Sequence, residues 1–180
     1  MRRTVFALSV MLMACTSGMQ VHESSAQNYA VDIPRGWRQI PTKRYFMVTR
    51  EGPFYQYALV QQRPLDKPFQ HTKKRLKANM LPQEAAEILA DEMLSDQKLR
   101  NLKIVENGPA KINGSEGFKL VFTYADPEGQ LYQTLYYGFL QGDFLYALRF
   151  TAAGKDYFER DVDSFYKMLA SFRLVPEGVD

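Results

Sequence analysis

The sequence predicts an α+β domain, in which a single antiparallel β-sheet of about six or seven strands packs with two helices as an α/β/α sandwich. Three observations support this prediction. Three successive segments near the C-terminus alternate between apolar and polar residues, and their connections are too short for parallel crossovers, so they form an antiparallel meander. Two other segments place apolar residues at helical spacing. Aromatic residues make up 13% of the chain, and strands favour them.

The first half of the folded part is predicted to contain three strands and one helix. Strand-like alternation falls in the segments 29–33, 45–50 and 55–63. A helix begins near Pro82, because proline favours the first helical position. Its apolar stripe comprises Ala85, Ile88, Leu89 and Met93.

The second half is predicted to contain four strands and a closing helix. The strands lie at 102–105, 114–124, 131–140 and 144–150. The helix covers residues 155–172, and its buried stripe comprises Phe158, Val162, Phe165 and Leu169.

The N-terminal segment has the features of an export signal. Arg2 and Arg3 precede an apolar run from Thr4 to Ala14. This run is too short to span a bilayer, which takes about 20 residues, but it suits a signal peptide. The run ends in Leu-Met-Ala-Cys at Cys15 and resembles the bacterial lipobox, which implies cleavage before Cys15 and lipid attachment to its thiol. An ordinary signal peptide with an incidental cysteine is the alternative.

The predicted organisation has four parts. Residues 1–14 are the signal peptide, 15–28 the lipidated cysteine and a flexible tether, 29–175 the folded domain, and 176–180 a C-terminal tail. Two or more acyl chains anchor a protein stably to a membrane. Thr16, rather than Asp, follows the cysteine. By the sorting rule of Gram-negative lipoproteins, this indicates the outer membrane, with the domain facing the periplasm.

The order of elements resembles that of the Mog1p/PsbP-like domains, which include exported bacterial proteins. The local matches are Ile33-Pro-Arg-Gly-Trp37, Gly114-Ser-Glu-Gly-Phe118, Leu145-Tyr146-Ala-Leu148 and Met168-Leu-Ala-Ser-Phe172. The resemblance covers roughly residues 29–175. It implies the fold and a non-catalytic binding or assembly role, but it assigns no site residues.

The residue types needed for several classes of chemistry are missing. Nucleophilic hydrolysis needs a base, and the folded part has one histidine, His71, and no Gly-x-Ser-x-Gly elbow. We therefore expect no enzyme. The acidic face of the first helix, with Glu84, Glu87 and Asp91, is more simply a solvated surface than a metal site, and His71 has no second ligand nearby. Phosphate loops and dinucleotide fingerprints are absent from the sequence, so no cofactor is expected.

The charge of the chain gives no support to a nucleic-acid partner. Of 23 Lys and Arg residues, Arg2 and Arg3 lie in the segment expected to be removed, which leaves 21 against 20 Asp and Glu. The mature protein is nearly neutral, so no strong field draws a polyanion to it.

Two surface features are candidates for docking. Four cations lie within five residues: Lys73, Lys74, Arg75 and Lys77. They could contact anionic head groups, lipopolysaccharide or an acidic protein, or they could form a solvated connector. Tyr132 and Tyr136 share one face of a strand. They suit an interface, because tyrosine is apolar with a polar tip, but core packing is the simpler interpretation, because strands favour such residues in any case.

These features predict a lipid-anchored binding or assembly module of the cell envelope that acts by contact with an unknown envelope protein. The alternative is a periplasmic carrier that holds a small apolar or amphipathic ligand between sheet and helix. An open cavity of several hundred cubic ångströms would favour the carrier. A filled core with an exposed apolar patch would favour the module.

Overall fold

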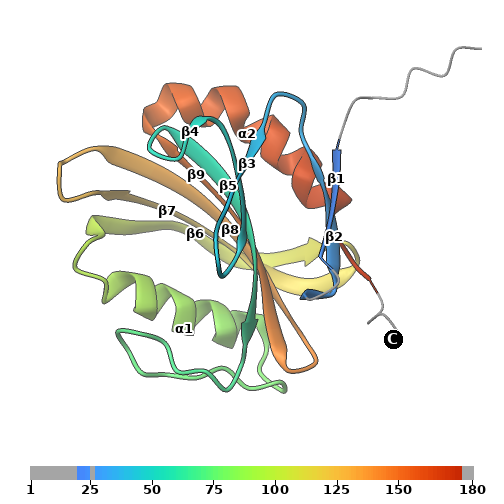
Figure 1. The fold of residues 1–180 in the computed structure, drawn as a ribbon. Coiled ribbons are helices and arrows are strands. Elements are labelled where there is room, and N and C mark those ends of the chain that lie inside the picture. Colours follow the sequence, from blue (N-terminus) through green and yellow to red (C-terminus); the bar gives the residue numbers. More distant parts are fainter. Residues whose placement is uncertain (1–19, 25–26, 176–180) are drawn as a thin grey trace, which may run out of the picture.

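A seven-stranded antiparallel sheet forms the middle layer of the protein (Figure 1). The computed structural model describes residues 20–24 and 27–175. The strand order of this sheet is β3-β4-β5-β9-β8-β7-β6. Its strands are β3 (Arg38–Ile40), β4 (Phe46–Gly52), β5 (Gln56–Pro64), β6 (Arg100–Ile112), β7 (Ser115–Ala125), β8 (Leu131–Gln141) and β9 (Phe144–Ala153). The predicted meander is confirmed, since β7, β8 and β9 pair in succession.

The prediction of a single sheet is wrong. A second sheet of three strands has the order β1-β2-β10 and consists of β1 (Gln20–Ser24), β2 (Tyr29–Ile33) and β10 (Arg173–Leu174). The chain turns directly after β2, where the backbone N–H of Trp37 donates to the carbonyl of Pro34 at 3.1 Å. This turn separates β2 from the large sheet. Alternation indicates that residues 29–33 form a strand, but it does not show which strand lies beside them.

Part of the expected flexible tether is ordered. Residues 20–24 form β1, which pairs antiparallel with β2 from Gln20 opposite Ile33 to Ser24 opposite Tyr29. The imidazole of His22 stacks on Phe46, with ring centroids 3.8 Å apart. β1 is an edge strand with largely exposed side chains, so it lacks the apolar alternation by which strands are recognised. Cys15 lies outside the described residues.

The two helices lie on opposite faces of the large sheet, as predicted. α2 (Gly154–Ser171) packs against β2, β5, β8 and β9, and α1 (Pro82–Leu94) packs against β6, β7 and β8. Figure 1 shows α2 above the sheet and α1 below it. The α/β/α layering is therefore present, with the small sheet beside the C-terminal end of α2. Within the described residues, neither helix has the length and apolarity needed to cross a membrane.

Each helix covers its own apolar core. Under α2, Phe165 stacks on Phe150 with ring centroids 5.6 Å apart, and Met168 is fully buried. Under α1, Leu89 packs in a cluster with Phe118, Leu120 and Phe122. Burying a side chain of this size stabilises a fold by about 1.5–3 kcal/mol, so both helices are held mainly by their apolar stripes.

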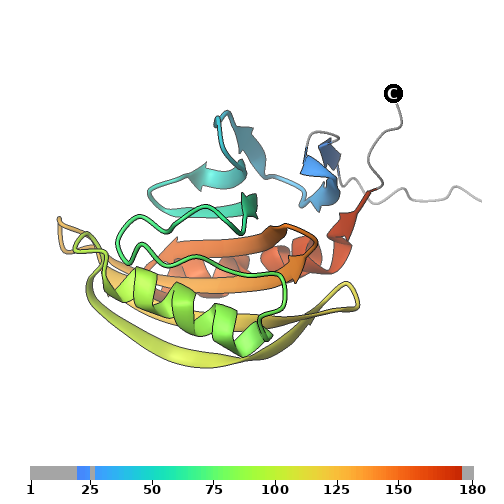
Figure 2. The ribbon, with the colours of Figure 1, turned by 90° about the horizontal axis from the view of Figure 1, so that it is seen from below.

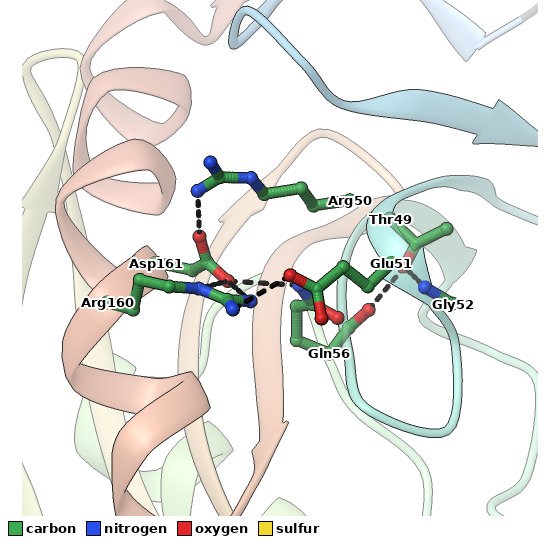
Figure 3. A network of polar contacts seen from close by, with 7 residues as sticks. All are labelled: Thr49, Arg50, Glu51, Gly52, Gln56, Arg160 and Asp161. Carbon is green, nitrogen blue, oxygen red and sulfur yellow. Dashed lines mark hydrogen bonds and ion pairs between the residues drawn. The ribbon is translucent and has the colours of Figure 1, made fainter.

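A buried carboxylate ties α2 to the hairpin of β4 and β5 (Figure 3). Asp161 is fully buried and accepts hydrogen bonds from Arg50 at 2.9 Å and from the side-chain amide of Gln56 at 3.0 Å. The neighbouring Arg160 donates to the same carboxylate at 2.7 Å and pairs with Glu51 at 2.8 Å. Arg50 and Arg160 remain partly exposed to solvent. Because Asp161 on α2 is bonded to residues of both β4 and β5, the network fixes the position of α2.

Candidate binding groove

A groove of about 490 Å³ opens on the sheet face that carries α1. α1 lies over β6, β7 and β8, so the part of this face formed by β5 and β9 remains beside the helix. The loop between β5 and α1 runs alongside the helix (Figures 1 and 2) and contributes residues 67–70 to one wall. The loop between β3 and β4 contributes Lys43 and Arg44.

Three side chains from neighbouring strands form the floor of the groove. Leu59 on β5 is paired with Arg149 on β9, and Arg149 is paired with Tyr136 on β8. Directly opposed residues in an antiparallel sheet project to the same face. The three side chains therefore form one row across the sheet, and all three line the groove.

Arg149 is held on this floor without a carboxylate partner in the described part of the chain. Its Nη2 donates to the hydroxyl of Tyr57 at 2.6 Å, and its guanidinium carbon lies 5.2 Å from the centre of the Tyr57 ring. Its Nε is buried and has no hydrogen-bond partner among the described residues. A guanidinium has five N–H donors and stays protonated in proteins. Arg149 therefore retains unused donors and a full positive charge at the floor of the groove.

Tyr136 adds a neutral hydroxyl to the floor. Only 5% of its surface is exposed, and its ring stacks on Phe118 with centroids 6.1 Å apart. Burial raises the pKa of the Tyr136 phenol above its ordinary value, and the charges of Arg149 and Arg63 only partly oppose this effect. The phenol is therefore protonated at neutral pH and can donate a hydrogen bond.

Arg63 stiffens the wall where β5 ends. It donates to the carbonyls of Pro64 at 3.0 Å and Lys67 at 2.8 Å. Its guanidinium carbon lies 4.2 Å from the centre of the Phe69 ring, a cation–π arrangement. Burial lowers the pKa of Arg63, but a guanidinium remains charged near neutral pH.

The groove has a strong excess of positive charge. The cations that line it are Lys43, Arg44, Arg63, Lys67 and Arg149, and Glu92 supplies the only lining carboxylate among the residues that the structure describes. Among residues 20–24 and 27–175, none of the five cations forms an ion pair. A concave surface lined by one sign of charge attracts ligands of the opposite sign.

Glu92 is already engaged by the loop that follows β5. Its carboxylate accepts hydrogen bonds from the backbone N–H of His71 at 3.0 Å and from the backbone N–H of Thr72 at 2.9 Å. Burial acts to raise the pKa of Glu92, but the hydrogen bonds from Thr72 and His71 outweigh it, and the pKa lies below its ordinary value. The negative charge of Glu92 therefore anchors a wall of the groove.

The basic stretch predicted from the sequence covers residues 67–77, and of its cations only Lys67 lines this groove. Its cations Lys73, Lys74, Arg75 and Lys77 are all exposed. Lys74 pairs with Asp91 at 2.6 Å, and Lys73 donates to the carbonyl of Gln70 at 2.7 Å. Between these cations Leu76 is buried, with 3% of its surface exposed. The stretch is thus attached to the domain both by an ion pair with α1 and by an apolar side chain.

The two tyrosines singled out in the sequence have different surroundings. Tyr136 is in the floor of the groove. Tyr132 lies further along the same strand, where it stacks on Tyr124 at 5.3 Å and donates to the carbonyl of Phe54 at 3.1 Å. The structure therefore brings Tyr136 to the groove, but not Tyr132 or the four cations Lys73, Lys74, Arg75 and Lys77.

Arg149 and Glu92 were missed in the sequence. Arg149 is the one charged residue in the largely apolar strand from Phe144 to Ala153, and a lone charge in such a strand is a usable signal. Glu92 interrupts the buried side of α1 in the same way. Elsewhere His71 contacts Asp96 at 3.6 Å, and the described residues contain no cluster of His, Cys, Asp and Glu that could hold a metal ion.

The sequence matches the PsbP family over residues 17–174. The chain belongs to the PsbP family. This confirms the resemblance to the Mog1p/PsbP-like domains. A comparison with curated protein sequences gives no match.

Solved structures share the fold of this PsbP-family chain at low sequence identity. Cyanobacterial PsbP (CyanoP) from Synechocystis is 12% identical, with a TM-score of 0.61, and the match covers 93% of this chain and 98% of that chain. The Ran-binding protein Mog1p of Saccharomyces cerevisiae is 8% identical, with a TM-score of 0.58 and coverage of 89% and 97%. LpqN of Mycobacterium tuberculosis, described as involved in cell envelope biogenesis, is 14% identical, with a TM-score of 0.54 and coverage of 88% and 92%.

Proposed function

We propose that this PsbP-family protein is a lipid-anchored binding module of the cell envelope that acts by contact with a partner protein and catalyses no reaction. The observation that carries the proposal is the basic groove, in which five cations have no ion-pair partner among the described residues. Such a surface suits recognition of an acidic partner. The described role of LpqN in envelope biogenesis supports an envelope setting.

The anchor is proposed from the lipobox-like sequence that ends at Cys15. Replacing Cys15 by Ser removes the only side chain that can form the thioether, so Cys15→Ser protein should appear as uncleaved precursor or as soluble protein. Fractionation of cells that express each form, with mass measurement of the N-terminal peptide, tests this. Recovery of Cys15→Ser protein in the membrane fraction, processed like the wild type, would contradict the anchor.

Contact with a partner is tested by cross-linking the anchored protein in cells and identifying the captured proteins. The groove variant carries Lys43→Gln, Arg44→Gln and Lys67→Gln, which change exposed side chains and should leave stability within about 0.5 kcal/mol per site. A partner captured by the wild type should be lost with this variant. The matched control changes Lys73, Lys74, Arg75 and Lys77 to Gln, because these cations lie outside the groove.

The carrier of a small amphipathic ligand is the second candidate, and the size of the groove favours it. A volume of about 490 Å³ falls within the range of about 300–1,000 Å³ for small-molecule sites, and Leu59, Leu89 and Tyr136 add apolar surface. A carrier purified from cells should retain its ligand. Native mass spectrometry and solvent extraction of the purified protein distinguish a retained small molecule from an empty groove.

A further inference from the structure

We propose that the groove recognises an extended acidic peptide segment of the partner, and that one carboxylate of this segment binds to Arg149 and Tyr136 on the floor. This proposal rests on the proposed function and specifies the chemistry of the contact. It identifies Arg149, on the central strand β9, as the residue that determines which ligands bind.

The floor is built to receive a negatively charged oxygen. The guanidinium of Arg149 lines the groove and is oriented by the Tyr57 hydroxyl at 2.6 Å. Its Nε has no partner among the described residues but is buried, so a ligand would meet the terminal Nη groups. The neutral phenol of Tyr136 lies next to it in the cross-strand row. A guanidinium and a hydroxyl side by side offer several donors to one carboxylate, and hydrogen bonds between ionised groups are the stronger kind. Arg149 was positioned by folding, so little side-chain entropy remains to be lost when an anion binds.

The arrangement of the other cations favours a chain of charges over a single small anion. Lys43 and Arg44 come from the loop between β3 and β4, whereas Arg63 and Lys67 come from the end of β5 and the loop after it. Arg63 is held by two backbone carbonyls and the Phe69 ring. It could turn toward Arg149 only by losing these contacts. The charges are therefore spread along the groove.

An extended peptide matches this spread. Its alternate side chains lie about 6.6 Å apart on one face, because each residue advances about 3.3 Å. Acidic residues at alternate positions could then meet Arg149 on the floor and the lysines and arginines at the rim. Gln61 and Gln70 also line the groove. Their amides both donate and accept hydrogen bonds, as the peptide backbone requires.

The test measures binding of a labelled peptide to the full chain in a non-ionic detergent. The probe contains six glutamates between Gly-Ser flanks, and the control peptide contains six glutamines in their place. The glutamate peptide should bind, and its affinity should fall as salt rises. Arg149→Met should weaken binding by on the order of 30-fold, because truncating one member of a buried charge pair is costly. Tyr136→Phe should weaken it by about threefold through loss of one hydroxyl.

Controls separate the groove from the general charge of the protein. Changing Lys73, Lys74, Arg75 and Lys77 to Gln removes four cations outside the groove and should change the affinity by less than about twofold. Melting temperatures identify any variant that fails to fold. If Arg149→Met does not fold, Tyr136→Phe and the exposed pair Lys43→Gln with Arg44→Gln decide the question.

Three results would overturn the proposal. The first is a folded Arg149→Met protein that binds the glutamate peptide as tightly as the wild type. The second is an equal loss of binding when the four cations outside the groove are changed. The third is displacement of the peptide by millimolar inorganic phosphate, which would mean that the site takes one small anion. A cellular partner captured equally by wild type and Arg149→Met would refute this inference alone, whereas the absence of any partner would refute the proposed function.

Discussion

The carboxylate of Glu92 accepts two hydrogen bonds from Thr72, one from the backbone N–H at 2.9 Å and one from the hydroxyl at 3.0 Å. The residues lie 20 positions apart in the sequence and join α1 to the loop that follows β5. The same carboxylate accepts the backbone N–H of His71. Because this loop forms a wall of the groove, α1 determines the shape of the groove although the helix covers only part of it.

Replacing Glu92 should detach the loop and destabilise the protein. Glu92→Ala leaves two backbone donors without their acceptor, and hydrogen bonds to a charged group contribute about 1.5–3 kcal/mol each. We expect the free energy of unfolding to fall by about 3 kcal/mol in urea denaturation. Glu87→Ala, an exposed acid on the same helix, is the control and should stay within about 0.5 kcal/mol. Similar losses in both variants would contradict the anchoring role.

Acid should weaken the attachment of α2 through Asp161. Burial acts to raise the pKa of Asp161, but hydrogen bonds from Arg160, Arg50 and Gln56 outweigh it and hold the pKa below the ordinary value of 3.8. A carboxyl group whose pKa is lower in the folded state than in the unfolded state stabilises the protein at pH values above its unfolded-state pKa. This contribution is lost as the pH falls through the folded-state pKa. Urea denaturation at a series of pH values should therefore show stability falling below about pH 3.8.

The Asp161→Asn variant isolates this effect. The amide cannot ionise, so the variant should be less stable than the wild type at pH 7 and should lose less stability in acid. Asp163→Asn changes an exposed acid on the same helix and serves as the control. If the wild type and Asp161→Asn lost equal stability on acidification, the carboxylate would have no part in the pH dependence.

Gly117 should be intolerant of any side chain. A Cβ at this position would collide with the backbone carbonyl of Gly138 on the next strand and would lie 2.7 Å from Ile112. Backbone cannot move aside cheaply in the middle of a sheet, so Gly117→Ala should cost about 1–3 kcal/mol. Gly108 has no atom within 4 Å of the equivalent position, and Gly108→Ala should be tolerated. Thermal unfolding of both variants checks the difference, and equal melting temperatures would show that β7 and β8 are further apart than described.

Removal of β1 should lower stability although the strand contributes little apolar surface. A fragment from Tyr29 to Val175 loses the pairing of β1 with β2 and the stack of His22 on Phe46. We expect it to melt several degrees below a fragment from Gln20 to Val175, a difference of about 1 kcal/mol. Calorimetry on the two fragments measures this difference. Identical melting temperatures would mean that residues 20–24 contribute nothing to the stability of the domain.

Elements with a strong local period could be predicted from the sequence. The stripe of Ala85 and Leu89 indicated α1, and the stripe around Phe165 indicated α2, because helical spacing is a property of neighbouring residues. The meander of β7, β8 and β9 followed from alternation and short turns, which leave only antiparallel pairing. β1, β3 and β10 were missed. β3 and β10 are two or three residues long, too short for a period, and β1 is mostly exposed.

The candidate site depends on contacts between segments that are distant in the sequence. Local patterns were enough to indicate a lipobox-like segment, two amphipathic helices and enough alternating strands for a layered α+β domain, since these features depend on residues close together in the chain. It drew attention to Lys73, Lys74, Arg75 and Lys77 because they are adjacent. The cations of the groove come instead from separate segments, with Arg44, Arg63 and Arg149 on different elements. Only the pairing of β5 with β9 and the position of α1 bring them to one surface, and long-range pairing of this kind leaves no local pattern.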